Sequence, residues 1–211
     1  MPKLMFSLSL AALLALPFGA HAQDDAAAAD GAETESAPQV VEPSGTDGLS
    51  MGAPVEDENA PGRSYTAGEF GDWQQRCIRT EDGSDPCQLY QLLRDSDGNA
   101  VAEMSVFPLP PGREAQAGAT IITPLETLLT RALTLQIDSG QAKRYPFEFC
   151  AAAGCFSRIG LTGAEVESFK RGAQGILTIA PAAAPDQTIE LTVSLSGFTA
   201  GYEAVAEANT N

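Results

Sequence analysis

Histidine is almost absent from this 211-residue chain, and its absence excludes several kinds of site. The single histidine, His21, lies in an N-terminal stretch typical of a secretory signal peptide, which export would remove. Without an imidazole, the remaining chain can form neither a Ser-His-Asp nor a Cys-His unit and has no histidine to ligate a metal. We therefore predict no catalytic residue, no cofactor and no metal site, and we expect that the protein is not an enzyme.

Carboxylates are the remaining side chains that acid–base chemistry could use. Glu69 with Asp72, and the isolated Glu103, are the only candidates. Their neighbours are typical of turns and strand surfaces, and the glycines are scattered among turns instead of preceding a helix as in a phosphate-binding loop. A carboxylate-based hydrolase is therefore the least favoured hypothesis of function.

No apolar run long enough to span a bilayer follows the first 18 residues. At the N-terminus, Lys3 precedes the short apolar run Leu4–Phe18, and Ala20, His21 and Ala22 have the small-x-small pattern of a cleavage site. This pattern predicts a cleaved signal peptide over residues 1–22 rather than an uncleaved anchor. We expect an exported chain without a transmembrane segment, located in the periplasm, at the outer membrane or outside the cell.

Residues 23–62 contain ten Asp and Glu but no Lys, no Arg and no aromatic residue. Such a segment cannot bury enough apolar surface to offset the entropy of ordering, so it is predicted to be a disordered acidic linker. It would act as a spacer, with an acidic docking arm for a cationic partner as the alternative. The formal net charge of −16 argues against nucleic acid and anionic lipid as partners.

Four cysteines follow the linker, at Cys77, Cys87, Cys150 and Cys155. An even number in an exported chain predicts disulfides. Three connectivities are possible, and we favour Cys77 with Cys87 and Cys150 with Cys155 because each closes a short loop of turn residues. A zinc site is the alternative, but the spacings lack the paired C-x2-C pattern.

Residues 143–161 predict two strands folded back on each other across a tight turn. Phe147, Phe149 and Phe156 are strand-forming aromatics, and residues 151–154 have the length and the glycine of a hairpin loop. Cys150 would then face Cys155. Pro146 cannot donate to a strand ladder, so we place it at the first position of the strand.

The rest of residues 63–211 predicts one domain made of short strands with a single short helix. Thr162 and Glu165 form a capping box that starts the helix, and Gly172 is placed to end it. Residues 95–99 predict a hairpin turn, and residues 124–132 fit either a helix or a structured connector. The strands are expected at residues 88–94, 101–107, 117–123, 133–137, 176–179 and 189–195. The fold class is therefore all-β, an antiparallel β-sandwich.

Trp73, the only tryptophan, opens an expected strand near the start of this domain. We interpret it as a core anchor, with a binding platform as the alternative.

Several segments of the domain resemble the invasion-associated locus B family of exported bacterial proteins. They lie in the same order and at similar spacing over almost the whole folded part. The resemblance implies an immunoglobulin-like β-sandwich, a secreted, periplasmic or outer-membrane-associated location, a role in host-cell invasion or envelope function, and no catalytic residues. The matching segments are Phe70–Trp73 with Cys77, Cys87–Leu89, Gly118–Leu129, Leu133–Asp138, Pro146–Phe147 with Cys150, Gly154–Phe156 and Ser194–Tyr202.

These observations favour a non-catalytic envelope protein that binds an envelope or host protein whose identity the sequence does not give. An exposed strand edge would allow it to recruit an extended segment by β-addition. The alternative is an adhesin or invasion factor at the cell surface.

Overall fold

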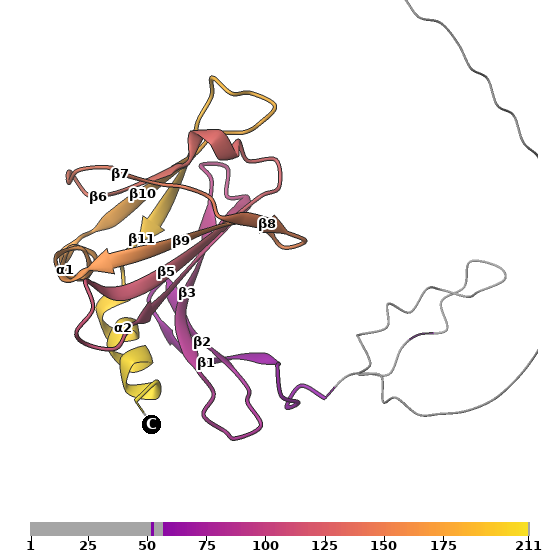
Figure 1. The fold of residues 1–211 in the computed structure, drawn as a ribbon, viewed down its shortest axis with the longest axis vertical. Coiled ribbons are helices and arrows are strands. Elements are labelled where there is room, and N and C mark those ends of the chain that lie inside the picture. The colour runs from indigo at the N-terminus through magenta and orange to yellow at the C-terminus, as the bar shows by residue number, and fades with distance from the viewer. Residues whose placement is uncertain (1–51, 53–56, 211) are drawn as a thin grey trace, which may run out of the picture. The chain divides into compact units, whose positions relative to one another are not determined.

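The computed structural model describes residue 52 and residues 57–210. The predicted signal peptide, residues 1–22, and most of the predicted linker, residues 23–62, lie outside the described residues. The described part of the folded domain consists of strands in two antiparallel sheets and two α-helices, so the predicted all-β sandwich is confirmed (Figure 1).

The larger sheet has seven strands in the order β1-β2-β3-β4-β5-β9-β8. Its first five strands follow one another along the chain as a meander, and β9 and β8 are added beyond β5 as a hairpin. The strands are β1 (Ser64–Phe70), β2 (Trp73–Ile78), β3 (Cys87–Arg94), β4 (Ala100–Pro108), β5 (Ala115–Thr123), β8 (Phe149–Ala151) and β9 (Gly154–Thr162).

The smaller sheet has four strands in the order β11-β10-β6-β7. They are β6 (Leu133–Ile137), β7 (Lys143–Tyr145), β10 (Gln174–Ile179) and β11 (Ile189–Ser194). The prediction that a strand begins at Pro146 was wrong. Pro146 has no N–H to donate, and the chain leaves the small sheet after Tyr145 and enters the large sheet only at Phe149.

Two α-helices pack against the inner side of the large sheet. Helix α1 (Gly163–Arg171) starts with the predicted capping box of Thr162 and Glu165 and is capped by Gly172 at its end. Helix α2 (Phe198–Ala208) was not expected from the sequence, and it packs across β1 to β4. Residues 124–132 form a connector, not an α-helix, and contain an isolated β-bridge from Thr127 to Pro181 and the 3-10 turn η1 (Leu129–Arg131).

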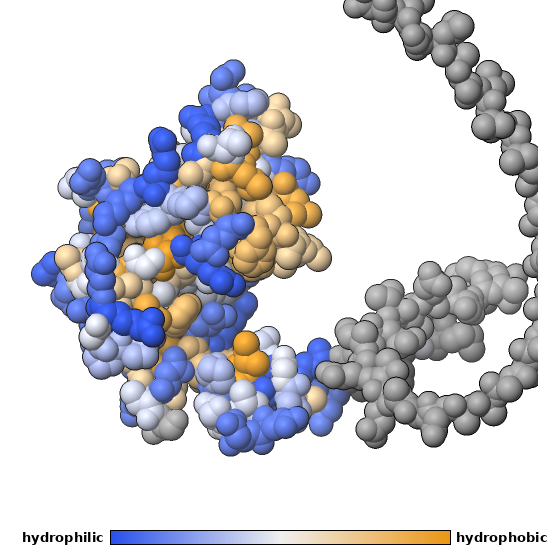
Figure 2. All heavy atoms as spheres, in the orientation of Figure 1, coloured by the Kyte–Doolittle hydropathy of each residue, from blue (hydrophilic) through white to orange (hydrophobic). Residues whose placement is uncertain are grey.

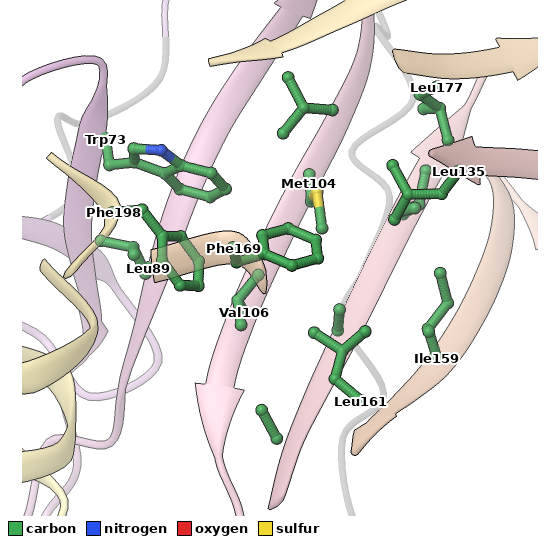
Figure 3. Packing of buried hydrophobic residues seen from close by; sticks show 14 of the residues in the cluster. Trp73, Leu89, Met104, Val106, Leu135, Ile159, Leu161, Phe169, Leu177 and Phe198 are labelled. Atoms are coloured by element: carbon green, nitrogen blue, oxygen red, sulfur yellow. The ribbon is translucent and has the colours of Figure 1, made fainter. Parts of the chain in front are cut away.

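The core lies between the two sheets and contains side chains from every strand from β2 to β6 as well as β9 to β11 and both helices (Figure 3). Trp73 is completely buried and meets Phe198 of α2 edge to face, with ring centroids 5.4 Å apart. Phe198 in turn contacts Phe169 of α1, with centroids 5.1 Å apart. This aromatic cluster fastens both helices to the sheets.

Two hairpins are joined by disulfides, Cys77–Cys87 and Cys150–Cys155. In each hairpin the two cysteines are direct partners in the strand register, with their Cα atoms 4.0 Å apart. The described residues contain no free cysteine. Each disulfide therefore holds the register of a pair of neighbouring strands.

Candidate interaction surface at the β8 edge

The large sheet ends at β8, a strand of only three residues. Within the described residues β8 is paired with β9 on one side, and the sheet order has no strand on its other side. The backbone N–H and C=O groups at that outer edge are a template for a further strand. Because the Cys150–Cys155 disulfide fixes this hairpin, the edge is held in an extended conformation before any partner arrives.

Exposed and half-buried apolar side chains surround this edge. We call them the apolar rim: Ile122, Leu125, Leu129, Phe149, Ala151–Ala153 and Phe156. Among the described residues, five large apolar side chains are classed as exposed, and three of them belong to the rim: Leu125 at 56%, Leu129 at 42% and Phe149 at 42%. Figure 2 shows apolar side chains gathered over β8 and the segment between β5 and η1. Such a concentration marks an interaction site more often than a single exposed leucine does.

The rim is organised by the register of the large sheet. Ile122 of β5 pairs with Phe156 of β9, and Phe156 pairs with Phe149 of β8, so the three side chains lie in one row on the same face. The rings of Phe149 and Phe156 stack with centroids 4.8 Å apart. The row therefore presents a firm apolar surface that reaches the open edge.

A charged pair borders this row. The guanidinium of Arg158 lies 5.4 Å from the centroid of Phe149, and its Nε is 3.7 Å from a carboxylate oxygen of Glu148. Both side chains are largely exposed, so the pair itself adds little stability. An apolar centre with a charged border is the usual composition of a protein interface.

Trp73, the residue singled out from the sequence, does not belong to this surface. Its indole N–H donates to the backbone carbonyl of Ser194 in β11 at 2.8 Å, and the ring is fully buried. Trp73 thus joins the two sheets and has no face open to a ligand.

Two of the three candidate carboxylates lie close together. Glu69 and Asp72 line the same surface depression of about 310 Å³. A carboxylate oxygen of Asp72 accepts a hydrogen bond from the Ser194 hydroxyl at 2.6 Å, which gives Asp72 a role in fastening β11. Glu103 neighbours Tyr90, whose pKa is raised by burial and then by the negative charge of Glu103. The described residues contain no group of three or more potential metal ligands.

A second cleft, of about 220 Å³, lies between α1 and β7. Its polar groups are paired with one another: Lys143 Nζ lies 2.6 Å from Glu165, and the Tyr145 hydroxyl donates to Glu165 at 3.4 Å. Burial and the charge of Glu165 raise the pKa of Tyr145 to about 12. The cluster therefore fastens the helix to the small sheet.

Sequence reasoning located the edge hairpin but missed Leu125 and Leu129 as parts of the surface. Their spacing fits the buried face of a helix, and burial is the usual fate of leucine. The signal that could have shown otherwise is the series of threonines at Thr123, Thr127 and Thr130, which lowers helix propensity and favours an extended connector.

The family model of the invasion associated locus B (IalB) proteins matches residues 73–206. The chain belongs to this family. The match begins at Trp73 and ends within α2, so it contains all four cysteines and the whole apolar rim. Residues 1–72 lie outside the match.

The IalB fold is also found in a solved structure. A crystal structure of invasion associated protein B from Bartonella henselae resembles this chain with a TM-score of 0.58 and 20% sequence identity, over 68% of this chain and 98% of that one. At this identity the likeness shows the fold. No curated protein matches the chain.

Membership in the IalB family agrees with what the structure says of the compartment. The two disulfides fit an exported protein. In the part of the chain that the structure describes, no helix is long and apolar enough to cross a membrane.

Proposed function

We propose that this chain is an exported, non-catalytic protein of the bacterial envelope that binds another protein through the apolar rim. The observation that carries the proposal is the coincidence of an open sheet edge at β8 with three exposed large apolar side chains, Leu125, Leu129 and Phe149. An extended segment of a partner would add beside β8, and its apolar side chains would continue the row that ends at Phe149.

Site-specific crosslinking in living cells tests this proposal. A photoreactive residue placed at Ala151, the last residue of β8, is expected to give one discrete adduct of higher mass. The same residue placed at Glu114, which is exposed in the turn between β4 and β5, is expected to give none. Equal adducts from both positions, or none from Ala151, would refute the proposal.

A role as a surface adhesin or invasion factor is the second candidate. It is favoured by the family description and by the name of the solved relative, both of which refer to invasion. The apolar rim would then meet a host protein in place of an envelope protein.

Protease accessibility separates the two candidates. The folded domain is followed with an antibody in intact cells and in cells with a gently opened outer membrane, with a periplasmic protein as the control. Protection until the outer membrane is opened supports the envelope partner. Cleavage in intact cells supports the surface role.

A further inference from the structure

The outer face of the small sheet carries a row of side chains that donate hydrogen bonds. Arg144 of β7 pairs with Thr134 of β6, and Thr134 pairs with Thr178 of β10. Thr134 lies between the buried residues Leu133 and Leu135, so strand alternation directs it away from the core. A guanidinium and two hydroxyls therefore lie side by side on three adjacent strands.

This row borders a small cavity of about 90 Å³ that a second arginine completes. Arg131 of η1 and Thr188 of the loop before β11 line the cavity with the row. Arg131 donates from Nη1 to the backbone carbonyls of Pro185 and Gln187, which holds that loop against η1. A guanidinium has five N–H donors, and these bonds use one nitrogen, so Arg131 can bind a ligand while it holds the loop.

The backbone beside Arg131 adopts an unusual conformation. Ala132 has φ 57° and ψ 170°, a region occupied almost solely by glycine. The other two non-glycine residues with positive φ in the described part are aspartates, Asp85 and Asp138, whose short polar side chains tolerate this region better. Ala132 lines the same cavity, and strained backbone of this kind clusters at ligand sites.

We infer that this cavity binds a tetrahedral oxyanion, the phosphate group of free phosphate or of a phosphate monoester. Two guanidiniums, which have donors and no acceptor, and three threonine hydroxyls, which can donate as well as accept, supply hydrogen bonds suited to phosphate oxygens. A volume of about 90 Å³ corresponds to roughly three water molecules, enough for the oxyanion alone, so any organic remainder extends into solvent. Glu190 pairs with Thr178 on the side away from Thr134, so two strands, β6 and β10, lie between this carboxylate and Arg144.

Titration of the purified chain with inorganic phosphate at low ionic strength, followed by amide NMR, tests the inference. We expect saturable shifts at Thr134, Thr178 and Thr188. Arg144→Gln should weaken phosphate binding by about tenfold to a hundredfold, because it removes charged hydrogen bonds. Arg144→Lys keeps the charge but loses the planar guanidinium. Its affinity for phosphate should therefore lie between those of the unmodified chain and Arg144→Gln.

Arg113→Gln is the matched control, since Arg113 is exposed in the turn between β4 and β5 and the charge change is the same. If Arg113→Gln lost as much phosphate affinity as Arg144→Gln, the binding would reflect general charge attraction, and the inference of a specific site would be wrong. The absence of saturable shifts in the unmodified chain would overturn it as well.

Vesicles of phosphatidylcholine with phosphatidic acid distinguish the two sources of the phosphate group. Binding to these vesicles that depends on Arg144 and is displaced by inorganic phosphate assigns the site to a headgroup monoester. Binding of inorganic phosphate alone assigns it to the free anion.

Discussion

Gln91 connects the two sheets at the scale of single residues. Its amide N–H donates to the backbone carbonyl of Ser194 at 3.0 Å, and its carbonyl oxygen accepts from the Ser194 N–H at 2.9 Å. Trp73 donates to the same Ser194 carbonyl, and Asp72 binds the Ser194 hydroxyl. One residue of β11 is therefore held by three side chains of the large sheet and its turn.

Replacement of Gln91 by methionine keeps the volume but leaves the Ser194 N–H without a partner. We expect Gln91→Met to lower the free energy of unfolding by about 1 to 3 kcal/mol, the cost of a buried unpaired polar group. Urea unfolding measures it. Gln88→Met, on the outer face of the same strand, is the control and should change the free energy of unfolding by less than about 0.5 kcal/mol. Equal effects in both variants would contradict the role of Gln91.

The turns that meet at this junction depend on glycine. Gly197 has φ 84°, and a Cβ there would lie 2.0 Å from the carbonyl oxygen of Phe70. The sequence indicates turns at Gly71 and at Gly197. It does not indicate that the backbones of these two turns are in contact, because that contact arises only from the arrangement of the sheets.

The carboxylate of Glu165 joins helix α1 to strand β7 through Lys143 and Tyr145. Burial raises the pKa of Glu165, but hydrogen bonds from Lys143 and from the backbone and hydroxyl of Thr162 outweigh it, so the pKa lies below its ordinary value. A lowered carboxyl pKa contributes stability above the ordinary pKa of about 4.5, and this contribution is lost as the pH falls through the lower value in the folded state.

Glu165→Gln should therefore lower stability by about 1 kcal/mol at neutral pH, and its deficit relative to the unmodified chain should shrink as the pH falls below the ordinary carboxyl pKa. Urea unfolding at a series of pH values follows this change. Glu167→Gln is the control, since Glu167 is exposed and its carboxylate lies 3.7 Å from the Nζ of Lys170. A deficit for Glu165→Gln that is independent of pH would contradict the account.

The two hairpin disulfides stabilise their elements by restricting the unfolded chain. Removing either pair by double substitution to alanine should cost about 2 to 3 kcal/mol in the chain-entropy model. The Cys77–Cys87 pair should cost more, because both of its residues are buried whereas Cys150 is exposed. Urea unfolding of the two double variants measures the difference, and free thiols in the purified protein would contradict both assignments.

Elements whose signals are local could be predicted from the sequence. The capping box of α1 is set by Thr162 and Glu165 alone, and the alternation at residues 189–195 is enough to define β11. Helix α2 was missed because glycine and aromatic residues weaken its local propensity. Its Gly201 is needed where the helix approaches Leu89, since a Cβ would lie 2.4 Å from that side chain. This packing requirement between distant residues cannot be recognised from the local sequence.

At the scale of the whole domain, the large sheet leaves one end of its outer face apolar and open. The hairpin could be predicted because two cysteines and aromatic residues mark it, whereas the exposure of Leu125 and Leu129 depends on how the connector after β5 runs past the sandwich. The rim thus results from the arrangement of the sheets, and it is the feature on which the proposed function rests.

The most direct test of this function compares two double variants in the crosslinking experiment at Ala151. Leu125→Ser with Phe149→Ser removes two exposed apolar side chains of the rim, and Ile78→Ser with Leu92→Ser removes two of similar exposure elsewhere. We expect the rim variant to lose about nine-tenths or more of the adduct, equivalent to at least about 1.4 kcal/mol of binding energy, while the control variant keeps it. Retention of the adduct in the rim variant, or equal loss in both, would contradict the claim that the rim is the binding surface.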